Sequence, residues 1–161
     1  QQGDRSTYDK IWELERESSL QEEKMRFLAA LSRFQDPLLL ENLLERSLTD
    51  EVRVQDAWVV LVQVAATSRG RDLAWRFVQD HWSEFDRRYG DGGFASARVV
   101  GITGSFTTTE QAVEVEQFFN DHPAPSASRT IQQSLERIRL NASWGKTNAQ
   151  SVDRWLLTSG D

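Results

Sequence analysis

The sequence contains no cysteine, only two histidines and only three prolines among its 161 residues. Without cysteine the chain has no disulfide, no thiolate ligand for zinc or an iron–sulfur cluster, and no thiol nucleophile. His81 and His122 stand far apart in the sequence, which nearly excludes a metal site built from several imidazoles. Acidic residues outnumber basic ones by 25 to 19, for a net charge of −6, so we expect no nucleic-acid partner.

Long apolar runs and targeting segments are missing as well. No uninterrupted stretch approaches the roughly 18 apolar residues of a membrane span, and the first residues lack the apolar core of a signal peptide. The chain starts with glutamine rather than methionine, so we expect it to be a piece of a longer protein. Its 39% hydrophobic and 27% charged residues are typical of a folded globular chain.

Helical spacing, in contrast, recurs along the whole chain. Phe27, Leu31 and Phe34 follow one another at steps of 4 and 3 residues, the period of one helix face. Asp36 before Pro37 is typical of an N-cap followed by the first helical residue. Residues 54–66 are apolar enough for a buried strand, but their length and flanking helices favour a central helix. Gly90 is expected to end a helix in the left-handed conformation.

The expected helices number about ten and are joined by short connections. They cover residues 6–17, 20–34, 37–48, 54–66, 83–90 and 94–102, with others around 73–81, 113–119, 131–142 and 152–156. Helices joined by short loops run roughly antiparallel, and each pair is too small to bury its own apolar face. The sequence therefore predicts an all-α fold: an α-solenoid of antiparallel helix pairs, a HEAT/armadillo-like superhelix in one helical-repeat domain over residues 1–161.

Several side chains invite a functional interpretation, and each has a structural alternative that we favour. Four tryptophans are expected to pack in the core or between helices rather than bind ligands: Trp75, Trp82, Trp144 and Trp155. Arg53, Gln55 and Asp56 are expected to cap or bridge adjacent helices rather than touch a substrate. We expect His81 to be packed or half-exposed, and His122 to belong to a turn.

Several segments carry a more specific resemblance. They are residues 21–24, 29–31, 52–56, 70–78, 118–133 and 136–144, including His-Pro-Ala-Pro-Ser at 122–126 and Arg-Thr-Ile-Gln-Gln at 129–133. In order and spacing they resemble the C-terminal helical domain of the zinc aminopeptidases related to puromycin-sensitive aminopeptidase, aminopeptidase N and the endoplasmic-reticulum aminopeptidases. The puromycin-sensitive branch is the most similar, and the resemblance covers roughly residues 8–157.

The catalytic parts of that family have no counterpart in this sequence. Zinc there needs H-E-x-x-H and a more distant glutamate, and a Gly-Ala-Met-Glu-Asn loop binds the free amine of the substrate. Neither motif occurs here, and Met25 is the only methionine. The resemblance therefore implies that this piece has no catalytic residue, cofactor-binding residue or metal ligand. Zinc would belong to a catalytic domain of the parent enzyme that lies outside this chain.

The resemblance implies a C-terminal cap that encloses the substrate cavity and contributes to peptide binding and selection. Its partners would be the enzyme's own N-terminal and catalytic domains and peptide substrates, in the cytoplasm. Arg33 corresponds to an arginine implicated in binding the C-terminal end of the peptide in the reticulum enzymes; alternatively it complements the dipole of its own helix. The alternative function is a free-standing peptide- or protein-binding helical-repeat scaffold.

A domain cut from a longer array loses the helices that cover its end. For this reason we expect the first helix to expose an apolar surface at Tyr8, Ile11 and Trp12, and the chain to associate with itself through that helix.

Overall fold

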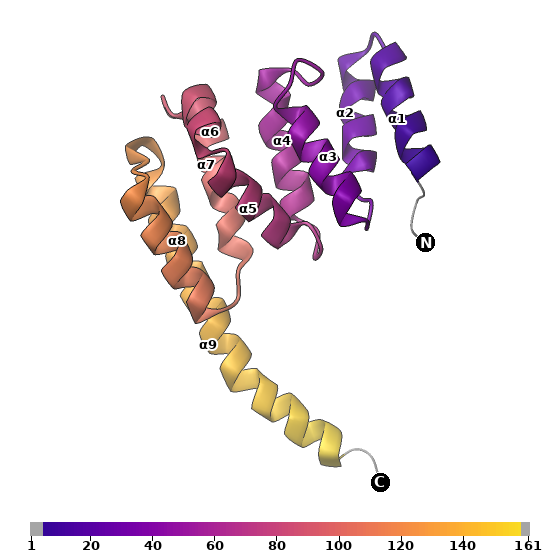
Figure 1. Cartoon of the computed structure of the whole chain (residues 1–161). Coiled ribbons are helices and arrows are strands. Elements are labelled where there is room, and N and C mark those ends of the chain that lie inside the picture. The colour runs from indigo at the N-terminus through magenta and orange to yellow at the C-terminus, as the bar shows by residue number, and fades with distance from the viewer. Residues whose placement is uncertain (1–4, 159–161) are drawn as a thin grey trace. The chain divides into compact units, whose positions relative to one another are not determined.

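The structure, a computed structural model, describes residues 5–158, without the side chains at 150, 153 and 156–158. Within this part it contains only helices and no strand, so the predicted all-α class is confirmed. The α-helices are α1 (Arg5–Glu17), α2 (Gln21–Leu31), α3 (Pro37–Ser47), α4 (Val54–Ala65), α5 (Arg71–Asp80), α6 (Trp82–Tyr89), α7 (Phe94–Gly101), α8 (Thr109–Asp121) and α9 (Ser128–Thr158) (Figure 1). Two short 3₁₀-helices cover Ile102–Ser105 and Pro125–Ala127. The chain divides into two compact units, Gln1–Ile102 and Thr103–Asp161.

The first unit contains α1 to α7, and each helix packs against near neighbours in the sequence. Helix α1 packs against α2 as an antiparallel pair, α3 against α4, and α4 against both α5 and α7 (Figure 1). Further contacts join α2 to α4 and α3 to α5. Contacts between helices close in sequence are what a helical-repeat protein requires; the solenoid arrangement itself stays a prediction.

Local sequence explains several helix boundaries in this unit. The Asp36 Oδ1 atom accepts the backbone N–H of Leu38 at 2.9 Å, and Pro37 follows as the first helical residue, as predicted. Residues 54–65 form helix α4, and Val60, Leu61 and Val64 are fully buried in it. The central helix predicted for this apolar segment is thus confirmed.

The second unit contains α8, α9 and the segments before and between them. Thr108 caps α8 through two reciprocal hydrogen bonds. Its hydroxyl accepts the backbone N–H of Gln111, and the Gln111 side-chain oxygen accepts the backbone N–H of Thr108. Helices α8 and α9 pack against each other. The apolar side chains buried in this unit are Phe106, Ala112, Val115, Phe119, Ala124, Ala127, Leu135, Ile138 and Ala142.

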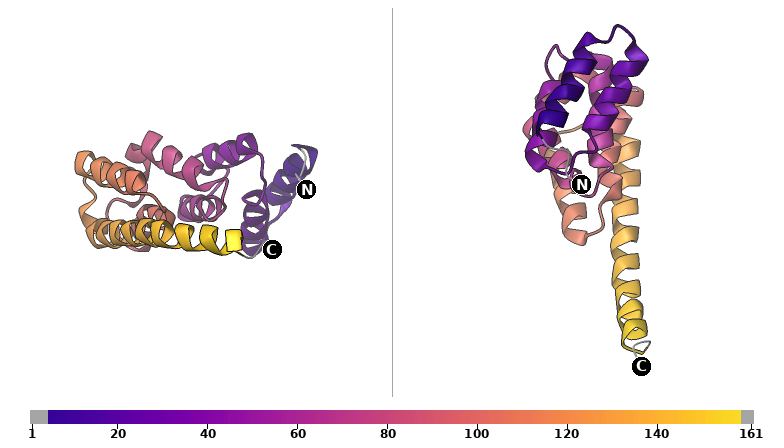
Figure 2. Two further views of the ribbon diagram at one scale, coloured as in Figure 1. Left: turned by 90° about the horizontal axis from the view of Figure 1, so that it is seen from below. Right: turned by 90° about the vertical axis from the view of Figure 1, so that its right-hand side faces the viewer.

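Two predictions about helix ends are wrong. Helix α9 is a single 31-residue helix, so the last helix expected at Val152, Trp155 and Leu156 is only its final part (Figure 2). A glycine at 145 costs a helix only about 1 kcal/mol, too little to divide it. Gly90 has a right-handed φ of −63°, and it is Gly92 (φ 102°) and Gly93 (φ 94°) that adopt left-handed conformations before α7.

The predicted apolar surface on the first helix is also wrong, because Tyr8 and Trp12 are fully buried. The Tyr8 hydroxyl donates to Asn42 Oδ1 of α3 at 2.9 Å, and its ring meets that of Phe34 edge to face at a centroid distance of 5.4 Å. Side chains from α2, α3 and the segment between them cover this face of α1, so no missing neighbour is needed to bury it. Ile11 is half-buried.

Candidate functional site

Arg33 lies in the connection between α2 and α3. Helix α2 ends at Leu31: the Ser32 N–H donates to the Leu28 carbonyl, and the Ser32 hydroxyl donates to Ala29 O at 2.8 Å. The Arg33 N–H donates to the Ala30 carbonyl at 3.2 Å. Arg33 is exposed, and its own carbonyl accepts a bond from the Gln35 side chain at 3.2 Å. Within the described part of the chain its guanidinium makes no hydrogen bond or ion pair. The five N–H donors of this group therefore face solvent and can bind a carboxylate.

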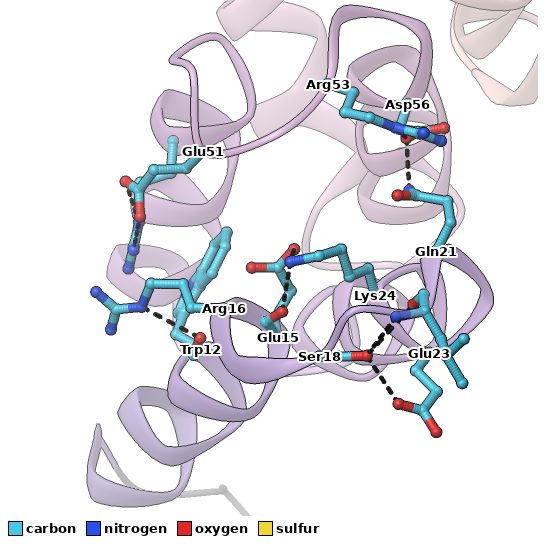
Figure 3. Close-up of polar contacts among 12 residues, drawn as sticks. Trp12, Glu15, Arg16, Ser18, Gln21, Glu23, Lys24, Glu51, Arg53 and Asp56 are labelled. Carbon is cyan, nitrogen blue, oxygen red and sulfur yellow. Dashed lines mark hydrogen bonds and ion pairs between the residues drawn. The ribbon is translucent and has the colours of Figure 1, made fainter.

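A group of polar side chains joins the start of α2 to the start of α4 (Figure 3). The Gln21 Nε2 atom of α2 donates to Asp56 Oδ2 of α4 at 2.8 Å, and Arg53 Nε donates to the same oxygen at 2.8 Å. The predicted role in bridging adjacent helices is confirmed for Asp56, whereas Arg53 pairs with Asp56 at the start of the same helix and Gln55 is exposed. These bonds fix α2 against α4.

A second polar contact fixes α1 against α2. The Lys24 ammonium donates to the Glu15 carbonyl at 2.6 Å and pairs with its carboxylate at 3.1 Å. The Glu15 side chain is only 4% exposed, so this partner keeps a buried carboxylate from standing alone (Figure 3). The pair leaves neither group free for acid–base catalysis.

The third cluster surrounds Trp12. The guanidinium carbon of Arg46 lies 3.8 Å from the centroid of the Trp12 ring, within the range of a cation–π contact. Arg46 Nε also donates to Glu51 Oε1 at 2.9 Å, and this bond lowers the pKa of Glu51. Arg16 Nε reaches the Trp12 carbonyl at 3.4 Å (Figure 3). This cluster packs the aromatic side chain and orients no reactive group.

Both histidines end helices in the same way. The backbone N–H of His81 and its Nδ1 both approach the Phe77 carbonyl, with the two rings 4.2 Å apart. His122 repeats this arrangement on Phe118, with the rings stacked at 4.4 Å. His81 is half-exposed and His122 exposed and next to the proline turn, as predicted for both. A Phe-x-x-x-His spacing thus closes α5 and α8.

The prediction for the tryptophans is only partly right. Trp75 is buried with 3% exposure, and Trp82 is half-buried. Trp144 and Trp155 are 71% and 64% exposed, so within the described part of the chain neither is buried in the core or between helices as predicted. They lie on the part of α9 that extends beyond the buried residues of the second unit.

An ion cluster on α6 was not among the predicted features. Glu84 accepts bonds from Arg87 and Arg88, and these lower its pKa to about 2. Arg88 also donates to the Leu48 carbonyl at 2.5 Å and so joins α6 to the end of α3. The i,i+3 and i,i+4 spacing of these charges predicts the pairs, but nothing local indicates the long-range bond to Leu48.

No group of three or more histidine, aspartate or glutamate side chains in the described part of the chain could hold a metal ion. None of the helices in that part combines the length and apolar character needed to cross a bilayer.

The sequence matches a known protein family over most of its length. Residues 1–140 match the family described as ERAP1-like C-terminal domain. The chain belongs to this family. The chain is 36% identical over 141 residues to aminopeptidase M1 of Arabidopsis thaliana, and 30% identical over 159 residues to aminopeptidase N of Mus musculus. It is 31% identical over 155 residues to the thyrotropin-releasing hormone-degrading ectoenzyme of Rattus norvegicus.

These alignments cover most of this chain but only a small part of each relative. They include 88%, 96% and 95% of this chain, but only 16%, 16% and 14% of the relatives. The predicted membership in the C-terminal domain of these aminopeptidases is confirmed. The similarity to the puromycin-sensitive branch in particular stays a prediction.

Proposed function

We propose that this ERAP1-like C-terminal domain is the helical cap of an aminopeptidase, non-catalytic by itself, which encloses the substrate cavity and helps to select peptides. The observation that carries the proposal is the match of nearly the whole chain to about one sixth of each relative. Two of these relatives are aminopeptidases by name. In a parent enzyme of that kind, the aminopeptidase activity would reside in the five sixths of the polypeptide outside this domain. The two compact units together would form one domain over residues 1–161, with the enzyme's N-terminal and catalytic domains as partners.

Zinc would belong to the catalytic domain of that parent enzyme. The described residues of this chain do not fit the metal, because they contain no cluster of three side chains that could coordinate it. We therefore assign no catalytic step to the chain. Its contribution would be physical, because a cap limits access to the cavity and positions the far end of a bound peptide.

Arg33 is the residue that we propose for binding that far end. Its guanidinium is exposed and makes no bond within the described residues, whereas Asp56 of α4 and Lys24 of α2 are paired. A free guanidinium binds a carboxylate through two parallel hydrogen bonds. The peptide's terminal carboxylate is the group that a cation at the cap would recognise.

The experiment compares Arg33→Ala with Arg76→Ala in the intact enzyme. Arg76 is an exposed arginine on α5 and serves as the matched control. We expect Arg33→Ala to raise KM roughly tenfold, the equivalent of about 1.4 kcal/mol, for long peptides with a free C-terminus. An aminoacyl amide and the same long peptide with an amidated C-terminus should be unaffected, and Arg33→Lys should restore part of the loss.

Two results would show that Arg33 only complements the dipole of α2. One is an equal change for long and short substrates, and the other is no change for either. If Arg33→Ala changed KM equally for the peptide with a free C-terminus and for the amidated peptide, Arg33 would not bind the terminal carboxylate.

A free-standing peptide- or protein-binding scaffold is the alternative, and the small share of each relative that the chain covers argues against it. The cytoplasmic location stays a prediction, since one relative is by its name an ectoenzyme.

A further inference from the structure

One apolar stripe runs along α9 without interruption. Its positions are Ile131, Leu135, Ile138, Ala142, Gly145, Ala149 and Val152. The steps alternate between 4 and 3 residues throughout, which is the spacing of a helix that packs along its length against another helix.

The first half of this stripe is covered within the second unit. Leu135, Ile138 and Ala142 are 8%, 0% and 7% exposed and lie on the helix that packs against α8. On α8, which packs against α9, Val115 and Phe119 are likewise buried, with 0% and 7% exposure. Helix α8 has 13 residues and α9 has 31, so α8 is too short to follow the stripe to its end.

The second half of the stripe is uncovered in the described chain. Gly145 and Ala149 are exposed, Val152 is 53% exposed, and a Cβ added at Gly145 would meet no atom within 4 Å. Trp144 and Trp155 lie beside them, 11 residues or about three turns apart and therefore along one line of the helix. We call Gly145, Ala149, Val152 and the two tryptophans the distal stripe.

Such a surface is costly for a helix that stands alone in water. A helical segment of this length is marginally stable without packing, and each exposed tryptophan presents an area of roughly 150–250 Å² that burial would remove from water. Glycine and alanine at successive stripe positions allow the backbone of a neighbouring helix to approach closely, with the tryptophans covering its flank.

We propose that the distal stripe packs against an apolar helix from the rest of the aminopeptidase polypeptide, which continues the α8–α9 interface beyond the end of α8. The inference rests on the proposed function, since it takes the chain to be one part of a larger enzyme. That helix would present bulky aliphatic side chains at steps of 4 and 3 residues, opposite Gly145 and Ala149.

Two observations favour this occupant over a second copy of the chain. The covered half of the stripe already packs against a helix of the same polypeptide, and the chain makes up only 16% of its relatives' length. The alignment with aminopeptidase N includes 96% of the chain, which leaves about 6 of 161 residues unaligned. Most of the distal stripe therefore has a counterpart within that enzyme.

The test measures hydrogen exchange of the backbone amides at residues 143–155, first in the isolated 161-residue chain and then in the intact enzyme. We expect fast exchange in the isolated chain and at least a hundredfold slower exchange in the intact enzyme, at concentrations where light scattering shows a monomer.

A matched pair of double variants assigns the protection to one helix face. Gly145→Gln with Ala149→Gln places two longer polar side chains on the distal stripe. Ser143→Gln with Thr147→Gln makes the same change, at the same spacing, on the opposite face of α9, where both residues are exposed. In the intact enzyme only the first pair should abolish the protection, while both variants should keep the helix content of the isolated chain.

Three outcomes would overturn the proposal. Fast exchange in the intact enzyme would leave the distal stripe without an occupant. Protection of the isolated chain that rises with concentration, together with a dimer, would make a second copy the occupant. Protection of the isolated chain that is independent of concentration would mean that the chain covers its own stripe. None of these depends on peptide kinetics, so failure of the cap function would be recognised separately.

Discussion

Gln21 and Asp56 lie 35 residues apart in the sequence and are joined by a hydrogen bond of 2.8 Å from Nε2 to Oδ2. The bond fixes α2 against α4, and Arg53 donates to the same oxygen from the residue before α4. The Asp56 side chain is only 13% exposed, so its carboxylate depends on these donors.

We predict that Asp56→Ala lowers the free energy of unfolding by about 1–2 kcal/mol, because two charge-assisted bonds are lost. Gln55→Ala, a change at the exposed neighbour, should stay within about 0.5 kcal/mol. Chemical denaturation of the single variants Gln21→Ala and Asp56→Ala and of the double variant measures the coupling, expected at about 0.5–1.5 kcal/mol. Additive effects of the two substitutions would show that the bond contributes nothing.

The two tyrosines predict how stability changes at alkaline pH. Burial raises the pKa of Tyr8 and of Tyr89 above 10.0, and their hydroxyls donate to Asn42 Oδ1 and to the Val54 carbonyl. The protonated phenol is favoured in the folded state, so both contributions are complete below the unfolded-state pKa of about 10 and are lost as pH rises through the higher folded-state pKa.

Since these are the only tyrosines of the chain, the rise in tyrosinate absorbance above the constant tryptophan background reports on these two phenols. We expect ionisation only above pH 10, in the same cooperative transition in which the far-ultraviolet circular dichroism of the helices is lost. Reversible ionisation of both phenols near pH 10 with the helices intact would contradict their burial.

Two glycines should respond in opposite directions to the same substitution in the isolated chain. Gly93 has a φ of 94°, so Gly93→Ala forces a side chain into the left-handed region and should destabilise the first unit by about 1–2 kcal/mol. Gly145 lies in helix α9 with open space around it, so Gly145→Ala should stabilise that helix by about 0.5–1 kcal/mol.

Thermal unfolding measures the first change and amide exchange in α9 the second. A neutral Gly93→Ala would mean that the segment before α7 adopts another conformation in solution. A destabilising Gly145→Ala in the isolated chain would mean that something already packs against this residue.

Local chemistry explains which features the sequence could predict. The N-cap at Asp36 and the apolar periodicity of α4 depend on residues a few positions apart, and the structure agrees with both. The resemblance rested on short segments in a fixed order and needed no three-dimensional information. The pairing of Arg53 with Asp56 was also within reach, because it spans three residues of one helix start.

The errors arise where long-range packing decides the outcome. Tyr8 is buried because Asn42, 34 residues away, and Phe34 meet it. Trp144 is exposed because α8 ends before it can cover that part of α9, and no residue near Trp144 reports the length of another helix. Periodicity identifies an apolar face but does not say what covers it.

The most direct measurement concerns the polypeptide that carries this chain in its natural source. An antibody raised against residues 1–161 captures that polypeptide, and its intact mass and its hydrolysis of an aminoacyl amide are then measured. If the chain is the cap of an aminopeptidase, as we propose, this polypeptide is several times longer than 161 residues and has aminopeptidase activity that the isolated chain lacks. A natural polypeptide of the chain's own size without that activity would contradict the cap function and favour a free-standing scaffold.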